Sequence, residues 1–220
     1  GKYMIQLLYD SIESLNEALS TPVDLSTANR IDDGHFAGSE EAFRHWDEDD
    51  PAVVSASCSK CHSADGLPLF IEEGVTIAQP TANGFLCSTC HDSLTELTRY
   101  PVGEVEFPSG ASLDSGNPDS NLCMNCHQGR QWAGNVDSAI AGLDPDTPSE
   151  DLGFRNVHYL PAAATLFGTE AQGVYEYPDK SYLGRNEHVD AFKNCTDCHT
   201  AHGLDVKVEA CSACHAGVET

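Results

Sequence analysis

Basic residues are scarce in this sequence, methionine is nearly absent, and long apolar runs are missing. The 220 residues include 11 Lys and Arg against 35 Asp and Glu, which gives a formal net charge of −24. Nucleic acid and anionic membrane surfaces are therefore poor partners, and we expect no nucleic-acid binding, since both surfaces bind basic faces. No run of about 18 or more apolar residues is present, so the sequence predicts no membrane-spanning helix.

The N-terminal segment also lacks the features of a signal peptide. Asp10, Glu13 and Glu17 interrupt any apolar run there, and no small-residue cleavage site follows. An exported form of this protein would therefore be one whose signal has already been removed.

No cysteine falls outside one repeated pattern. The ten cysteines form five C-x-x-C pairs, and a histidine directly follows each pair. The pairs are Cys58 and Cys61, Cys87 and Cys90, Cys123 and Cys126, Cys195 and Cys198, and Cys211 and Cys214. The histidines that follow them are His62, His91, His127, His199 and His215. C-x-x-C-H is the attachment signature of c-type haem, in which the two thiols add to the haem vinyl groups and the histidine reaches the iron.

Two other uses of cysteine pairs explain this pattern less well. Zinc ribbons use C-x-x-C pairs two at a time to complete a tetrahedral shell, so five pairs leave one over. A disulfide framework suits ten cysteines in an exported protein, but it gives no reason for the five histidines. The pattern therefore favours five covalently attached haem groups.

With these five motifs, the sequence resembles the multihaem c-type cytochromes, and specifically a pentahaem one. The resemblance implies haem attachment outside the cytoplasmic membrane, and so an extracellular, cell-surface or periplasmic protein. It also implies a mainly irregular chain with several short α-helices and little β structure, because the porphyrins form most of the core. We expect one haem-cored domain, in which an N-terminal helix and arm (residues 1–57) form one cooperative unit with a pentahaem body (residues 58–220).

Outside the motifs, the number of histidines equals the number of expected irons. The five candidate distal ligands are His35, His45, His158, His188 and His202. Methionine is the usual alternative as a distal iron ligand, but Met124 lies inside a motif and cannot reach the far face of its own haem. Met4, in the N-terminal segment, is the one free methionine candidate. The equality predicts bis-histidine ligation of every iron.

Two of these histidines precede or follow a motif closely. His199 and His202 are three residues apart, so on a helix or tight turn both point to the same side. His202 then cannot reach the opposite face of the haem that His199 holds, and we expect it to serve a different one. We expect the same of His188, from a short helix over residues 186–199 capped by Asn186.

Patterns outside the motifs predict a few regular elements. Apolar residues at i+3/i+4 spacing predict an amphipathic helix over residues 3–19, packed on its own subunit or on another. A second short helix, capped by Ser39, presents His45. We also expect a hairpin around Pro108–Gly110 and a short helix after Pro161.

Two further segments carry alternatives that the sequence leaves open. The acidic run at residues 47–51 is either a solvated face or a calcium site, since clustered carboxylates suit a hard cation. Residues 173–184 form either a hairpin over a haem face or part of the core. Their aromatic contacts would come from Tyr175, Tyr177 and Tyr182.

The ligand count favours electron transfer over catalysis. An enzyme needs an open iron site, and the sequence has no C-x-x-C-K motif and enough histidines to close every iron. A compact chain of this length has a radius of gyration of about 17 Å, so five haems must lie nearly in contact. We therefore expect a conductor without enzymatic activity, and a haem oxidoreductase with one open iron is the least favoured alternative.

Two kinds of electron carrier fit these features. One is a soluble periplasmic shuttle that feeds a reductase. The other is the subunit of an extracellular conductive filament (a nanowire), where the resemblance implies that each subunit lends a histidine to a neighbour's haem. His35 and His45 precede the first motif, and the N-terminal helix has an apolar face without an evident partner. We therefore favour a homopolymer, with redox proteins or extracellular acceptors as its other partners.

Overall fold

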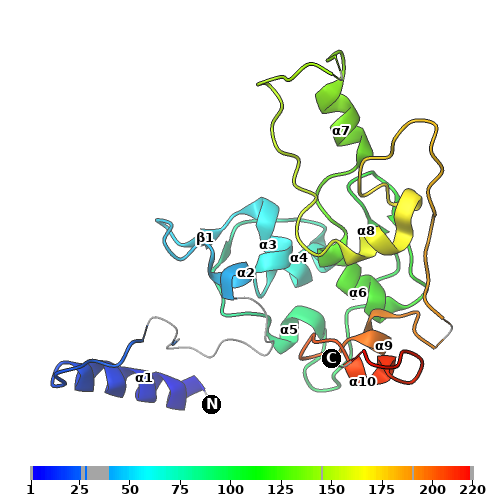
Figure 1. The fold of residues 1–220 in the computed structure, drawn as a ribbon. Coiled ribbons are helices and arrows are strands. Elements are labelled where there is room, and N and C mark those ends of the chain that lie inside the picture. Colours follow the sequence, from blue (N-terminus) through cyan, green and yellow to red (C-terminus); the bar gives the residue numbers. More distant parts are fainter. Residues whose placement is uncertain (1, 26–27, 29–39, 145, 190, 219–220) are drawn as a thin grey trace. The chain divides into compact units, whose positions relative to one another are not determined.

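The regular structure consists of short helices and two small antiparallel sheets, joined by long irregular segments (Figure 1). This confirms the expected fold class. The computed structural model describes residues 2–25, 28, 40–144, 146–189 and 191–218. The expected ligand His35 and the expected helix cap Ser39 lie outside these residues. Within them, no helix combines the length and the apolarity needed to cross a bilayer.

The chain forms two compact units. The first comprises residues 1–99 and 201–205, and the second comprises residues 100–200 and 206–220. A unit defined by contacts is not necessarily a unit of cooperative unfolding. The expected division into an arm and a body that unfold together therefore stays a prediction.

The first unit contains five helices among its described residues. They are α1 (Lys2–Asn16), α2 (Glu40–Arg44), α3 (Ala56–His62), α4 (Gly66–Glu73) and α5 (Cys87–Cys90). Strands β1 (Val53–Val54) and β2 (Gln79–Pro80) pair antiparallel, with Val53 opposite Pro80. The amphipathic N-terminal helix and the short helix before His45 are thus both present as expected.

Close packing joins α3 to α4. A Cβ on Gly66 would lie 2.0 Å from the Ser59 carbonyl oxygen, so only glycine fits at this position. The buried Ser63 hydroxyl donates to that carbonyl at 2.6 Å and accepts from the Gly66 N–H at 3.0 Å. Phe43 of α2 meets Phe85 edge to face, with ring centroids 4.9 Å apart. The first cysteine motif therefore lies on a packed polypeptide scaffold.

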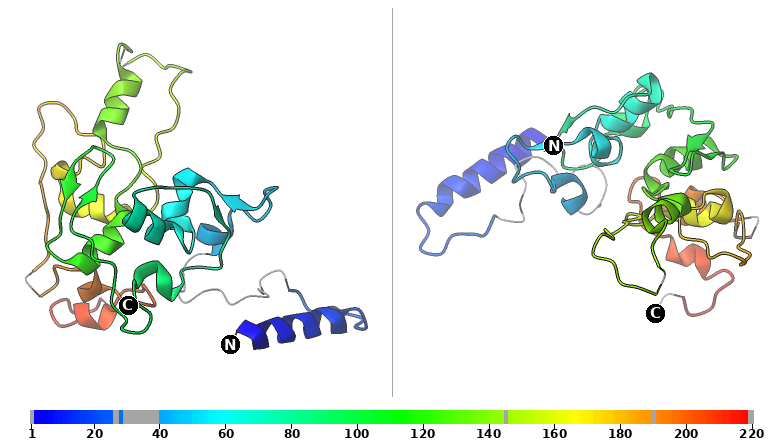
Figure 2. Two further views of the ribbon diagram at one scale, coloured as in Figure 1. Left: turned by 180° about the vertical axis from the view of Figure 1, so that it is seen from behind. Right: turned by 90° about the horizontal axis from the view of Figure 1, so that it is seen from above.

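The second unit begins with the expected hairpin, formed by β3 (Val105–Glu106) and β4 (Ser112–Leu113). Its helical elements are α6 (Pro118–His127), α7 (Ala133–Ile140), α8 (Ala162–Phe167), the 3-10 helix η1 (Gly168–Glu170), α9 (Cys195–Cys198) and α10 (Val208–Cys211). α8 starts directly after Pro161, as expected. Helix α6 packs against α8, α9 and β3 (Figure 2).

The apolar core of the second unit lies between α6, α8 and the hairpin. Phe107 and Phe167 are almost fully buried, and their ring centroids are 5.8 Å apart in an edge-to-face arrangement. Met124, inside the third motif, is also buried here. Its side chain is thus part of the core, in agreement with its exclusion as a distal ligand.

The helix expected over residues 186–199 is wrong apart from α9. Residues 186–189 and 191–194 are not helical. The Asn186 N–H donates to the Leu166 carbonyl at 2.7 Å, and the Arg185 guanidinium donates to the Ser115 carbonyl at 2.7 Å. These tertiary hydrogen bonds hold the chain extended and outweigh its local helix preference.

The tyrosine-rich segment contains a turn at residues 178–179 but no strand between residues 173 and 184. The rings of Tyr175 and Tyr177 meet edge to face at 5.0 Å, and the Tyr182 hydroxyl accepts from the Tyr177 N–H at 3.0 Å. The segment is therefore a loop closed by its own tyrosines. The hairpin alternative is not formed, and Tyr177 and Tyr182, at 65% and 41% exposure, are not part of a core.

Candidate haem-attachment sites

Each C-x-x-C-H motif is built on a helical turn. The backbone N–H of His91, His199 and His215 donates to the carbonyl of the first cysteine of its motif, at 3.0, 2.9 and 2.9 Å. The other two motifs lie in α3 and at the end of α6. Side chains at positions i, i+3 and i+4 share one face of such a turn. The two thiols of each motif are therefore expected on one side of the turn, and the histidine follows at its end, with an extended backbone at His91 and His199.

The ten motif cysteines lie at the surface of the packed polypeptide. Cys87 and Cys214 are exposed. The half-buried ones are Cys58, Cys61, Cys90, Cys123, Cys126, Cys195, Cys198 and Cys211. A thiol that is to react with a haem vinyl group has to be reachable from outside the polypeptide core, and none of the ten is fully buried. Attachment at each of these cysteines stays a prediction from the motif, with which their exposure agrees.

The competing uses of these cysteines find no support. None of the ten, all of which the structure describes, forms a disulfide. Among the described residues, no group of three or more His, Cys, Asp and Glu side chains is arranged to hold a metal ion, as a zinc ribbon would need. Haem attachment needs no such cluster, because the porphyrin itself supplies most of the iron ligands.

The acidic run at residues 47–51 is exposed, and one of its carboxylates is already paired. Asp47 accepts from the Arg44 guanidinium at 2.6 Å. Since these described carboxylates form no metal-binding group either, the solvated face is the better supported alternative. The calcium site stays an expectation of the sequence alone.

Backbone carbonyls from other segments orient three of the motif histidines. The Nδ1 atoms of His62, His91 and His127 each lie within hydrogen-bonding distance of such a carbonyl. The acceptors belong to Ala42 (2.6 Å), Leu97 (3.0 Å) and Leu160 (2.8 Å). A carbonyl only accepts, so in the neutral imidazole this contact favours the tautomer with the proton on Nδ1 and the lone pair on Nε2. Histidines that bind metals in proteins are typically oriented in this way.

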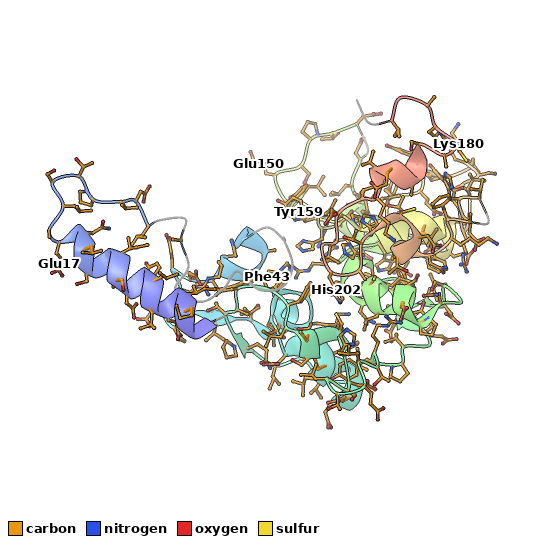
Figure 3. All side chains as sticks on the ribbon, turned by 90° about the horizontal axis from the view of Figure 1, so that it is seen from below. Glu17, Phe43, Glu150, Tyr159, Lys180 and His202 are labelled. Atoms are coloured by element: carbon orange, nitrogen blue, oxygen red, sulfur yellow. The ribbon has the colours of Figure 1, made fainter. Side chains whose placement is uncertain are left out.

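Two non-motif histidines face a motif histidine. The ring of His202, labelled in Figure 3, lies with its centroid 6.4 Å from that of His91, and the ring planes are inclined by 36°. The rings of His188 and His215 are 6.2 Å apart and inclined by 57°. Each contact lies within one compact unit, the first within residues 1–99 and 201–205 and the second within residues 100–200 and 206–220.

His45 and His158 lie near motif residues in a less direct way. The Trp46 ring contacts both His45, at 5.2 Å, and the motif histidine His62, at 5.6 Å. His158 packs against Tyr159 at 5.6 Å and has a left-handed backbone, with φ of 84°. It precedes by two residues the carbonyl that orients the third motif histidine.

Large apolar side chains are exposed beside the candidate ligands. Leu94 and Leu97, which follow His91, are 58% and 63% exposed. Tyr159 and Leu160, which follow His158, are 80% and 75% exposed. Such side chains gain free energy when an apolar surface covers them. The residues around the ligands therefore fit a large planar apolar group such as a porphyrin.

The thiols of two different motifs meet in the second unit. A hydrogen bond with the Cys123 side chain lowers the pKa of Cys195 to about 6, and a hydrogen bond with Ser120 adds to this effect. Burial instead raises the pKa of Cys90 and of Cys198. The cysteines that would hold the third and fourth haem groups are thus direct neighbours.

Sequence reasoning missed two residues that position the site. The Ser120 hydroxyl accepts from the Cys195 N–H at 3.1 Å and so joins α9 to α6. Arg185 anchors the segment before His188 through the Ser115 carbonyl, while its own N–H donates to a Glu170 carboxylate oxygen at 3.0 Å. Neither residue belongs to a motif, and nothing in the sequence distinguishes it from other polar residues.

Comparison with known proteins identifies polyhaem relatives and confirms the resemblance to multihaem c-type cytochromes. The C-type polyheme cytochrome OmcC of Geobacter sulfurreducens is 30% identical over 195 residues, which cover 71% of this chain and 24% of that protein. The C-type polyheme cytochrome OmcB of the same organism is 27% identical over 266 residues, with 93% and 32% coverage. The chain thus spans about a quarter to a third of the length of these curated relatives. No family model and no solved structure matches the chain.

Proposed function

We propose that this relative of the polyhaem c-type cytochromes transfers electrons through five covalently bound haem groups, each with two axial histidines. The observation that carries the proposal is that all five C-x-x-C-H motifs lie on helical turns. In three of them a backbone carbonyl on Nδ1 leaves Nε2 available to the iron. When bound there, haem supplies a one-electron Fe(III)/Fe(II) couple.

The chain's own residues would hold these groups and limit their chemistry. The ten cysteines fix the porphyrins covalently, and the five motif histidines take one axial position each. Five further histidines are enough to take the opposite positions, which leaves no iron open to a substrate. The proposal is therefore of a carrier without enzymatic activity.

The form proposed for this carrier is a subunit of an extracellular conductive filament. Two features support it. His45, and His35 outside the described residues, both precede the first motif in the sequence. Helix α1 exposes a row of apolar side chains, with Met4, Leu8 and Leu15 at 55%, 58% and 63% exposure. Such a row suits a contact with another copy of the chain.

The electron-transfer proposal is tested by counting haem groups and determining their spin states. Mass spectrometry of the protein, produced with haem-attachment machinery, should show five haem additions. Electron paramagnetic resonance should then show low-spin ferric iron throughout. Fewer than five haem additions would contradict the five-haem carrier. A high-spin iron in the resting protein would indicate an open coordination site and would favour the haem oxidoreductase.

The filament is tested by electron microscopy of native protein released without detergent. Thin filaments with a short axial repeat are the expected result, and dispersed single subunits would favour the periplasmic shuttle instead. The variants His35→Ala and His45→Ala then test which of the two histidines coordinates a haem iron of the neighbouring subunit. The correct variant should yield folded pentahaem monomers with one high-spin iron, and filaments with every iron low-spin in both variants would contradict the inter-subunit ligand.

A further inference from the structure

We infer that His202 is the distal iron ligand at the His91 motif and that His188 is the distal iron ligand at the His215 motif. The inference rests on the proposed function and deepens it, because equal numbers of irons and histidines do not say which histidine serves which iron. Two of the five irons would then have both histidine ligands from the same chain.

The separation of the rings matches coordination of one iron from both sides. An imidazole nitrogen lies about 2.0 Å from a bound metal, and the ring centre lies about 1.1 Å behind that nitrogen, so two trans imidazoles have centres about 6.2 Å apart. The observed separations are 6.4 Å for His91 and His202 and 6.2 Å for His188 and His215. The structure therefore holds both pairs at the spacing that a shared iron needs.

An ordinary aromatic contact is the alternative explanation, since such contacts also span about 4.5–7 Å between centroids. The composition of the pairs argues against it. In both cases a motif histidine faces a non-motif histidine, as one proximal and one distal ligand would. At His91, moreover, Nδ1 is occupied by the carbonyls of Leu97 and Thr98 at 3.0 and 3.2 Å, so Nε2 is its remaining ligand atom.

The position of His202 follows from a short closed loop. His199 and Val206 form an isolated β-bridge, and the Lys207 N–H donates to the Cys198 carbonyl at 2.8 Å. The turn at residues 201–203 in this loop carries His202. Three residues of chain span at most about 11 Å. The closed loop therefore carries His202 only three residues after the motif histidine His199.

The position of His188 follows from anchors on the residues just before it. Arg185 donates to the Ser115 carbonyl at 2.7 Å, and the Asn186 N–H donates to the Leu166 carbonyl at 2.7 Å. Both acceptors belong to the packed part of the second unit. These contacts make Arg185 a positioning residue for His188, which lies three residues further along the chain.

The ligands are tested in the full pentahaem protein by His202→Ala and His188→Ala. Each variant should convert one of the five irons to high spin in electron paramagnetic resonance, and added imidazole should restore the low-spin signal. Asp205→Asn, in the same loop, and Val189→Ala, next to His188, are matched controls in exposed positions. Both controls should keep every iron low-spin. Unchanged spin states in the histidine variants would overturn the inference.

Double variants test the pairs themselves while every cysteine stays in place. His91→Ala with His202→Ala should alter only one iron, because both ligands serve the same one, whereas His91→Ala with His188→Ala should alter two. The reverse pattern, or two altered irons in both cases, would overturn the pairing. If a double variant does not fold, His202→Met in otherwise unmodified protein gives a second readout. It should raise the potential of one haem, and a redox titration with no shifted component would overturn the assignment.

The two proposals fail in distinguishable ways. An open iron or a missing haem in the unmodified protein contradicts the proposed function. Suppose that the unmodified protein has five low-spin irons but the number of altered irons in the double variants differs from the expected one and two. This result would contradict only the pairing of the histidines.

Discussion

The third motif and the last two motifs lie in the same compact unit but are held in different ways. Helix α6, which carries the third motif, has five buried residues, whereas α9 and α10, which carry the fourth and fifth, have none. The polypeptide therefore builds its own core around the third motif. Around the last two it supplies mainly turns and ligands. The difference indicates that their order depends more strongly on bound haem.

A buried hydrogen-bond network secures α6. The Asn121 amide oxygen accepts from the Ser115 N–H and hydroxyl at 2.9 and 2.7 Å. The amide nitrogen donates to the Val102 carbonyl at 3.1 Å and to Asp114 at 2.7 Å. One side chain thus connects the helix to two preceding loop segments.

The fourth and fifth motifs are held without buried residues in α9 and α10. The Lys207 ammonium donates to the Thr196 carbonyl at 2.6 Å, and its N–H closes the loop onto Cys198. Ser120 connects α9 to α6. In the fifth motif, the Cys214 N–H donates to the Cys211 carbonyl at 3.1 Å, a contact within the turn itself. Hydrogen bonds of this kind contribute about 1 kcal/mol each, much less than a buried aromatic core.

The largest effect is expected from withholding haem. In protein made without haem-attachment machinery, residues 191–218 should lose amide-exchange protection, because this region has few apolar contacts of its own. Helices α6 and α8 should keep more of theirs. Hydrogen exchange measured by mass spectrometry on haem-free and haem-loaded protein checks this. Equal loss of protection in both regions would show that the third motif depends on haem as strongly as the last two motifs do.

Phe167→Ala should produce the next largest effect, because it opens a cavity beside Phe107. We expect a loss of about 3–5 kcal/mol in the free energy of unfolding of the second unit. Denaturant titration of the haem-loaded protein, followed by exchange at α6 and α8, measures this. Phe154→Ala is the matched control, since that ring is 90% exposed, and it should change stability by no more than about 0.5 kcal/mol.

Asn121→Ala should destabilise the α6 region by about 2–3 kcal/mol, because it leaves buried donors and acceptors unpaired. The loss should appear as faster amide exchange at Ser115 and along α6. Asn135→Ala in α7, whose side chain accepts only the Trp132 N–H, at 3.2 Å, provides a milder comparison. An equal loss in both variants would show that the network does not set the stability of α6.

Ser120→Ala should have the smallest effect, about 1 kcal/mol, because it removes one acceptor from the Cys195 N–H. Amide exchange should accelerate at α9 while the protection of α6 is kept. Ser138→Ala in α7, which removes one exposed hydrogen bond to the Gly134 carbonyl at 2.7 Å, is the control. Faster exchange throughout α6 would mean that the two motifs are not stabilised separately.

The parts of the fold that the sequence predicts correctly are local. The amphipathic spacing of α1, the turn residues of the β3–β4 hairpin and Pro161 before α8 act over a few positions. The helix expected before α9 is wrong because distant groups decide it, namely the carbonyls of Leu166 and Ser115.

The sequence by itself determines where covalent haem can attach, because two thiols and an imidazole within five residues meet on any helical turn. It also determines that the histidines outside the motifs equal the motifs in number. Only the tertiary structure decides which histidine faces which motif. His91 and His202 are about 110 positions apart, and no local periodicity reaches that far. The hydrogen bonds of Arg185 and Asn186 likewise hold the segment before His188, because only long-range contacts fix a side chain relative to a distant segment.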